Sequence, residues 1–324
     1  MTATIQPAEW LRYIDKEYLA TYIRGGGSAI KFAVPMEDGL RSDLFAGLAA
    51  IGNRAGYLAI NINAAETKVH MVDELFFRTA EQIPWKKLSR KAIETIAVEG
   101  GYSWVDKPDG PLYRHLADAN QVEPQMLLMD LKQAIWKRVF KQRNLSKDFR
   151  VAMTHLCMAE LSGGPDSATA IHALTEWLTG RNRAVSAVKP FQIYRKINRA
   201  TGRYFFESLA NWVQFAGYPG IVIVLDAQRV TLARNPRDNG LFYSKAAVLD
   251  TYEVLRQFID AADQLNGCFL AVVPDIAFLE DQGQGRGIGA YEALKFRVFD
   301  EVRDRNLVNP MASLARISAN ERGV

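Results

Sequence analysis

Hydrophobic and polar positions follow two different periods along the chain, and the changes of period predict its secondary structure. Residues 9–23 place apolar side chains at helical spacing, and residues 29–34 form an apolar run of strand length. A second helical pattern then begins near Ser42, which we expect to be its N-cap. Residues 57–62 and 68–83 repeat the order of strand and helix. The first part of the chain therefore predicts successive strand–helix units.

The middle of the chain is predominantly helical, and strands return after it. Helical periodicity recurs in five segments: residues 86–98, 124–143, 148–161, 168–178 and 203–215. Strands are predicted at 220–225, 267–273 and 312–317, with helices at 245–265 and 291–305. Alternating strands and helices are typical of a parallel α/β sheet. We expect residues 1–84 and 201–324 to form one five-stranded α/β domain, interrupted by a helical insertion of residues 85–200.

Composition excludes several classes of protein. Hydrophobic residues make up 48% and charged residues 23% of 324 residues, which excludes disordered, collagen-like and disulfide-scaffold chains. The longest apolar runs are too short to span a bilayer. The first residues include Glu9 and Asp15 instead of a basic and then apolar signal pattern. We therefore expect a soluble, cytoplasmic protein without a membrane partner, in which Cys157 and Cys268 are reduced core thiols.

Positive charge is concentrated in the predicted insertion. The net charge is +4, but residues 85–200 hold 19 basic and 11 acidic residues. Candidate contacts to double-stranded DNA are Lys132, Lys137, Arg138, Lys141, Arg143, Arg181, Arg183, Arg195, Lys196 and Arg199. Aromatic side chains such as Trp136 and Phe140 lie between them. The alternative interpretation is a solvated helix surface above core aromatic residues.

The string SGGPDS at residues 162–167 has two interpretations. It matches the pyrophosphate loop of ATP pyrophosphatases, which has to follow a buried strand. It also matches a helix end, a turn at Pro165, and a cap at Asp166 or Ser167 for the next helix. The residues before Ser162 have the pattern of an amphipathic helix, which favours the second interpretation. The four histidines are scattered and predict no metal site.

One strand ends in an acidic residue. Residues 221–225 are apolar and precede Asp226, as in the Walker B strand of P-loop NTPases, where the carboxylate holds Mg²⁺. The alternative is a core strand whose terminal Asp226 caps a turn. Ala227 stands where a water-polarising glutamate follows in active enzymes.

Taken together, the order of these parts resembles a known family. The segments that carry the likeness are residues 22–32, 210–226, 252–260, 269–278 and 290–297. They are similar to BREX-system ATP-binding proteins of the BrxD-like type, which are P-loop NTPases related to AAA+ enzymes. The resemblance implies a P-loop NTPase-like (AAA+/ASCE) parallel sheet, ATP and Mg²⁺ as cofactors, and other subunits of a phage-defence system as partners. It also implies that homo-oligomers can form, with Arg286 or Arg297 as the candidate arginine finger.

The phosphate loop that the resemblance implies is degenerate. The pattern G-x-x-x-x-G-K-[ST] falls on residues 35–42, whose relevant members are Pro35, Gly39, Leu40, Arg41 and Ser42. Only Ser42 matches. Pro35 offers no backbone N–H, Leu40 adds a side chain, and Arg41 replaces a compact ammonium group.

We therefore expect a pseudo-NTPase without catalytic residues or a required cofactor, which serves as a scaffold for partner proteins and DNA. In this interpretation Asp226 caps a turn, and Arg41 pairs with Glu37 or Asp38 in the vacated phosphate site. The alternatives are an active AAA+-type ATPase subunit and an ATP pyrophosphatase that uses residues 162–167.

Overall fold

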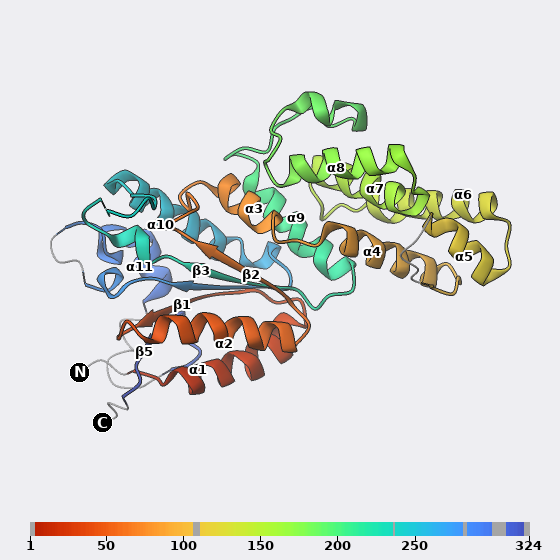
Figure 1. Cartoon of the computed structure of the whole chain (residues 1–324). Coiled ribbons are helices and arrows are strands. Elements are labelled where there is room, and N and C mark those ends of the chain that lie inside the picture. Colours follow the sequence, from red (N-terminus) through yellow and green to blue (C-terminus); the bar gives the residue numbers. More distant parts are fainter. Residues whose placement is uncertain (1–3, 106–110, 236, 281–283, 300–308, 321–324) are drawn as a thin grey trace. The chain divides into compact units, whose positions relative to one another are not determined.

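The chain folds into two compact units. The computed structural model describes residues 4–105, 111–235, 237–280, 284–299 and 309–320 (Figure 1). One unit, here called the sheet unit, comprises Met1–Thr79 and Pro219–Val324, and the other, the helical unit, comprises Ala80–Tyr218.

Five parallel strands form the sheet unit's core. They are β1 (Ala29–Pro35), β2 (Leu58–Asn63), β3 (Ile221–Asp226), β4 (Cys268–Val273) and β5 (Leu314–Ile317). The strand order is β2-β3-β4-β1-β5, and every neighbouring pair is parallel. This arrangement confirms the predicted α/β, P-loop NTPase-like sheet. The strand order also inserts β4 between β1 and β3, the two strands that precede the candidate nucleotide motifs.

Helices cover both faces of this sheet, as parallel sheets require. One face packs against α1 (Pro7–Tyr13), the π-helical segment Ile14–Ile23 and α2 (Leu40–Arg54), with Trp10 and Leu48 in the shared core (Figure 1). The other face packs against α10 (Lys245–Asp260), and α11 (Glu292–Val298) packs on α10. On that face the Phe32 and Phe278 rings stack with centroids 5.5 Å apart.

The helical unit is organised around α7. Its helices are α4 (Trp85–Glu99), α5 (Leu112–Asn120), α6 (Pro124–Ile135), α7 (Lys147–Ser162), α8 (Pro165–Leu178) and α9 (Gly202–Phe215), and α3 (Val72–Ala80) precedes them. The unit includes α9, beyond the predicted boundary at residue 200, because Phe205 packs against Phe149 of α7 and Trp177 of α8. The short helix α5 has no counterpart among the predicted segments.

The string at residues 162–167 connects two helices. Helix α7 ends at Ser162, Gly163 and Gly164 have φ angles of 64° and 91°, and Pro165 is the first residue of α8. These left-handed φ angles favour glycine, and proline suits the first helical position. The expected cap at Asp166 or Ser167 is wrong, because Gly164 occupies that position. A helix precedes Ser162, so the strand that a pyrophosphate loop requires does not stand there.

Other predicted boundaries shift by a few residues. Helix α2 begins at Leu40 with Gly39 as its N-cap, so Ser42 lies in the first turn and is not the cap. Helix α11 ends at Val298, and the rest of the predicted helix 291–305 lies largely outside the described residues. No helix in the described part of the chain is both long and apolar enough to cross a bilayer. Cys157 and Cys268 are buried and unpaired.

Strand β1 carries a buried lysine. Lys31 Nζ donates hydrogen bonds to the carbonyl oxygens of Met311 (2.5 Å) and Ala312 (3.1 Å), and it lies 4.5 Å from the centroid of the Tyr18 ring. These contacts tie the segment before β5 to the sheet. Burial disfavours the ammonium form and lowers the Lys31 pKa to about 8.

We predict a pH dependence of stability that comes from Lys31. Between pH 8 and the ordinary lysine pKa, the unfolded chain binds more protons than the native chain, so stability increases with pH. The unfolding free energy of the native protein minus that of Lys31→Met should therefore increase by about 1 kcal/mol from pH 7 to pH 9. Urea denaturation at both pH values measures this difference. The same difference for Lys16→Met, which removes an exposed lysine, should stay constant; equal behaviour of the two variants would contradict the prediction.

Candidate functional site

The candidate site lies at the carboxyl end of the sheet. Strand β1 ends at Pro35 and leads through residues 36–39 into α2, while β3 ends at Asp226 and β4 at Val273. Asp226 and Val273 are register partners in the parallel ladder. Open parallel sheets bind ligands outside the carboxyl ends of their strands, so this edge is where the resemblance would place a nucleotide.

The Arg41 guanidinium occupies this edge. Its Nη1 donates to Asp226 Oδ1 and to the Val273 carbonyl oxygen, both at 2.9 Å, and its Nη2 donates to the Pro274 carbonyl oxygen at 2.8 Å. The side chains of Arg41 and Asp226 are only 15% and 19% exposed. One side chain from α2 therefore joins the ends of β3 and β4.

The predicted partners of Arg41, Glu37 or Asp38, are wrong. The Glu37 carboxylate instead accepts hydrogen bonds from Ser318 Oγ (2.7 Å) and from the Ala319 backbone N–H (3.2 Å). Asp38 is exposed. Glu37 thus holds the segment after β5, which leaves Asp226 as the carboxylate partner of Arg41.

Asp226 has a second structural contact. Its Oδ1 also accepts the Gln228 backbone N–H at 3.0 Å, so Asp226 caps the turn that follows β3. The same oxygen therefore accepts from both Arg41 and Gln228. A magnesium ion at this oxygen would have to displace both donors.

Two backbone donors around the loop between β1 and α2 already have acceptors within the sheet unit. Pro35 has no N–H, the Met36 N–H donates to the Ile317 carbonyl oxygen at 2.8 Å, and the Leu40 N–H donates to the Glu37 carbonyl oxygen at 3.2 Å. Ser42 Oγ lies 3.3 Å from the Gly39 carbonyl oxygen. A phosphate loop instead directs several free N–H groups at its ligand. These residues do not fit a Mg²⁺-bound triphosphate.

The two candidate arginine fingers lie in the sheet unit and bind its own groups. Arg286 is buried, and its Nη1 donates to the Tyr243 carbonyl oxygen at 2.9 Å. Arg297 is paired with Asp260, with Nη2 2.9 Å from Oδ2. An arginine finger must have its guanidinium free to reach the phosphates of a bound nucleotide, in its own or a neighbouring subunit. The buried guanidinium of Arg286 does not meet that requirement.

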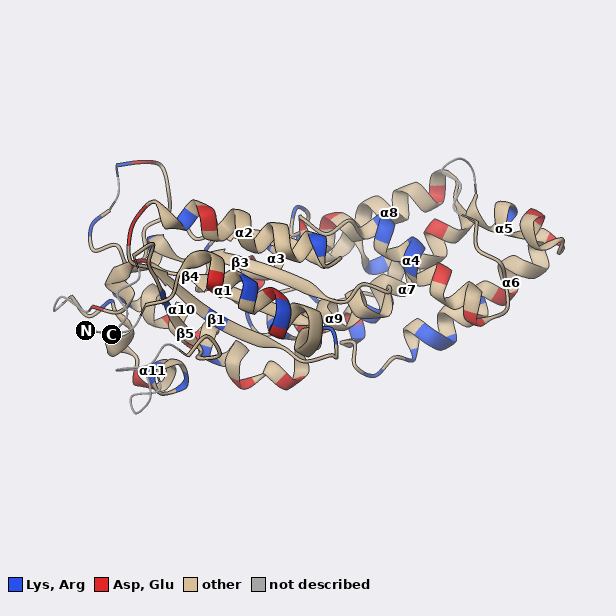
Figure 2. Cartoon of the chain, turned by 90° about the horizontal axis from the view of Figure 1, so that it is seen from below, with Lys and Arg blue, Asp and Glu red and all other residues tan. Residues whose placement is uncertain are grey.

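The basic residues of the helical unit are partly neutralised. Arg138 pairs with Glu99, Arg181 lies near Glu176 and Glu81, and Arg195 pairs with Asp148. Figure 2 shows acidic residues interspersed with the basic ones on these helices. The candidate DNA contacts therefore do not form one uniformly positive stretch.

Two basic segments nevertheless meet at the start of α7. Arg195 Nε donates to Asp148 Oδ2 at 2.9 Å, which brings residues 195–199 to this point. The Arg150 guanidinium lies 5.7 Å from the Phe140 ring centroid, which brings in residues 137–143. Phe140 itself stacks on the exposed Trp136 with centroids 3.8 Å apart.

Sequence reasoning missed the carbonyl groups that complete the site. The oxygens of Val273 and Pro274 accept from Arg41, yet backbone carbonyls have no residue-type signature. Within the described residues, no group of three or more His, Cys, Asp or Glu side chains is placed to hold a metal ion.

One comparison with known proteins gives a match. A family model described as BREX system ATP-binding protein BrxC/D matches residues 103–322. The matched range includes most of the helical unit and β3, β4 and β5, whereas β1 and residues 35–42 precede it. No curated protein and no solved structure matches the chain significantly.

We predict that removing the Asp226 charge destabilises the protein. Asp226→Asn leaves the partly buried Arg41 without its countercharge and should lower the unfolding free energy by about 1 to 3 kcal/mol. Urea denaturation measures the change. The matched control is Asp15→Asn, which breaks the Arg54–Asp15 pair, where the Arg54 side chain is 67% exposed. That substitution should cost less than about 1 kcal/mol. Equal losses of unfolding free energy in the two variants would show that the Arg41–Asp226 pair stabilises the protein no more than an exposed ion pair does.

Proposed function

Because the chain belongs to the family of BREX system ATP-binding proteins BrxC/D, we propose that it is a non-catalytic subunit of a phage-defence system. Membership of the BREX system implies other subunits of that system as partners. In the proposed role the protein acts in the cytoplasm, and the α/β sheet is a scaffold that no longer turns over ATP.

The observation that carries this proposal is the position of the Arg41 guanidinium. A triphosphate with Mg²⁺ could enter only if Arg41 left Asp226 and the two carbonyl oxygens that it binds. If Arg41 stayed, a metal ion at Asp226 would face a cation at short range. Two unit charges 4 Å apart repel by about 4 kcal/mol at the effective dielectric constant of a protein surface.

The residue after Asp226 also supports loss of hydrolysis. Ala227 is 4% exposed, and its N–H donates to the Val273 carbonyl oxygen at 3.0 Å. A methyl side chain cannot polarise an attacking water, which is the task of a glutamate in active relatives of this fold. Both the phosphate contacts and the water-activating group are therefore missing from this position.

We expect the purified protein not to bind ATP. Calorimetric titration with ATP and Mg²⁺, and with ADP, should give no binding heat up to about 1 mM nucleotide. Phosphate release should equal that of buffer. The matched variant Leu40→Gly/Arg41→Lys/Ala227→Glu restores the loop glycine, the compact cation and the glutamate. ATP binding by this variant, provided that circular dichroism shows it to be folded, would support the proposal that the phosphate site has been vacated.

The proposal has a clear contrary result. Steady ATP turnover by the native protein that disappears in Asp226→Ala would identify an active subunit. Mg²⁺-dependent micromolar binding without turnover would retain the scaffold but make nucleotide its ligand.

A second function, contact with double-stranded DNA, is favoured by the start of α7. There Arg195 and Arg150 bring residues 195–199 and 137–143 together. Lys141, Arg143 and Lys196 are exposed in these segments and form no ion pair with a described residue. Cations from two segments at a helix start suit the phosphates of a duplex backbone. In the proposed role, the subunit therefore also contacts duplex DNA through this surface.

Reversing charges at this point should weaken DNA binding. We expect Lys141→Glu/Lys196→Glu to bind a labelled duplex about tenfold more weakly than the native protein at about 0.1 M salt, with a smaller salt dependence. Fluorescence anisotropy measures both quantities. The matched control is Lys16→Glu/Lys68→Glu, which reverses two exposed lysines of the sheet unit. Equal weakening in the two variants would point to net charge alone, and binding by neither the native protein nor the variants would remove DNA from the proposed role.

A further inference from the structure

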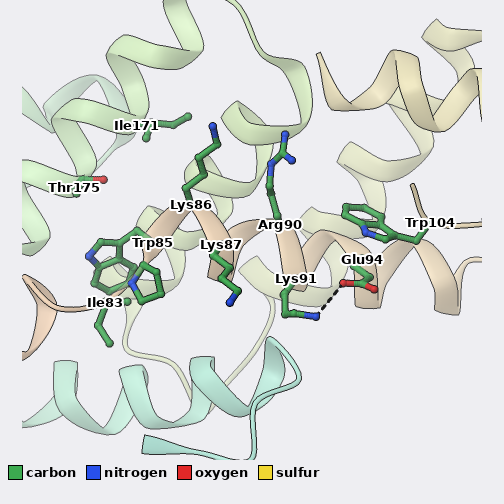
Figure 3. A pocket seen from close by; sticks show the side chains of 11 residues that line it. Ile83, Trp85, Lys86, Lys87, Arg90, Lys91, Glu94, Trp104, Ile171 and Thr175 are labelled. Carbon is green, nitrogen blue, oxygen red and sulfur yellow. Dashed lines mark hydrogen bonds and ion pairs between the residues drawn. The ribbon is translucent and has the colours of Figure 1, made fainter. Parts of the chain in front are cut away.

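The helical unit contains a groove that the nucleotide and DNA arguments do not use. It has a volume of about 540 Å³ and lies between the first part of α4 and the side of α8 (Figure 3). Its apolar surface comes from Ile83, Pro84 and Trp85 at the start of α4, and from Ile171 of α8. Trp104 lies at its other end. The cavity is large enough to take several side chains of a ligand.

Four cations line the same groove. They form two pairs on α4, Lys86 with Arg90 and Lys87 with Lys91. The two members of each pair are one helical turn apart. Figure 3 shows Lys86 and Arg90 directed towards the α8 side, and Lys87 and Lys91 directed away from it. Each pair therefore forms a row in which the charges are about 6 Å apart along the helix. An anionic ligand could meet either row.

The charges of the groove are only partly compensated. Arg90 Nε lies 3.4 Å from Glu160 Oε2, and Lys91 Nζ lies 3.4 Å from Glu94 Oε2. Burial raises the pKa of Glu160, which is 5% exposed at its side chain. Lys87 is exposed and forms no ion pair with a described residue. The lining residues therefore leave an excess of positive charge beside an apolar surface.

From this combination we infer that the groove binds an acidic peptide segment of a partner protein, anchored by an apolar side chain. The inference rests on the proposed function, because it names the surface through which a scaffold subunit would hold another protein. Carboxylates spaced by one helical turn match the row of Lys86 and Arg90, which is directed towards the α8 side (Figure 3). An aliphatic or aromatic side chain between them would cover Ile171 and Pro84.

The aromatic residues favour a peptide over a nucleic-acid strand. Trp85 is 5% exposed, its Nε1 donates to the Ala80 carbonyl oxygen at 2.9 Å, and its ring packs against Phe149. Its faces are therefore closed to a base. Trp104 is the other aromatic residue of the lining, and it is partly exposed. Single-strand binding instead uses a series of exposed rings on which successive bases stack.

The test is fluorescence anisotropy with the full-length protein and three labelled probes. The first probe is a synthetic peptide in which Glu and Leu occupy alternate helical turns, the second replaces every Glu by Lys, and the third is an oligothymidylate of the same length. The groove variants are Lys86→Glu/Lys87→Glu, which reverses charge, and Thr175→Trp, which fills the cavity without changing charge. The matched control, Arg114→Glu/Lys189→Glu, reverses two exposed cations of the same unit.

We expect saturable binding of the acidic peptide and none of the lysine peptide. Both groove variants should weaken the acidic peptide about tenfold, the control should change it less than about twofold, and added salt should weaken it. Absence of saturable binding by the native protein, or an equal effect of the control and groove variants, would overturn the inference. Tighter binding of the oligothymidylate that both groove variants weaken would also overturn it, and would assign the groove to nucleic acid.

The results distinguish this inference from the proposed function. Native protein that lacks both ATP turnover and peptide binding would retain the non-catalytic subunit and remove the groove as its docking surface. Native protein that hydrolyses ATP and binds the acidic peptide would retain the groove and remove the non-catalytic role.

Discussion

A partly buried cation at the end of a parallel sheet needs negative charge or carbonyl oxygens around it, and Arg41 has both. The Asp226 carboxylate neutralises the guanidinium, and the carbonyl oxygens of Val273 and Pro274 accept two further hydrogen bonds. A planar guanidinium can reach three acceptors from one position, which an ammonium group cannot do with the same geometry. The start of α2 and the ends of β3 and β4 are consequently held by one side chain.

The order of the strands makes this contact available. Since β4 lies between β1 and β3, the end of β4 stands between β1, which leads to α2 and Arg41, and the strand that ends in Asp226. The carbonyl oxygens of Val273, at the end of β4, and of Pro274 are therefore within reach of a side chain at the start of α2. The Glu37 carboxylate is instead directed to the other side of the loop, where it accepts hydrogen bonds from Ser318 and Ala319. The loop is thereby fixed on one side to β5 and on the other to β3 and β4.

The sequence predicted best those elements whose structure depends on neighbouring residues, namely the buried strands and one turn. Apolar runs located β1, β3 and β4 to within one or two residues, and the turn at Gly163 and Gly164 followed from glycine and proline chemistry. Helix α5 was missed because nine residues contain few periods of a helical pattern.

The partner of Arg41 could not be predicted in the same way. Glu37 and Asp38 are close in sequence, whereas Asp226 is 185 residues away. Which strand ends are neighbours depends on strand order, and hydrophobic periodicity contains no information about that order. The sequence patterns single out Arg41 and Asp226 individually, but the ion pair between them could not be predicted from those patterns. The boundary of the helical unit depended in the same way on a long-range contact, that of Phe205 with Phe149 and Trp177.

Arg41 occupies the carboxyl end of the sheet, where a nucleotide-binding fold would hold its ligand. The interactions that stabilise this end of the sheet unit are therefore different. In a nucleotide-binding fold, ligand phosphates neutralise the cation of the loop, so stability increases with ligand concentration. Here Asp226 provides that neutralisation from within the same unit, and the loop donors of Met36 and Leu40 are satisfied by Ile317 and Glu37. In the proposed scaffold role, this internal neutralisation would keep the edge of the sheet ordered irrespective of the nucleotide concentration.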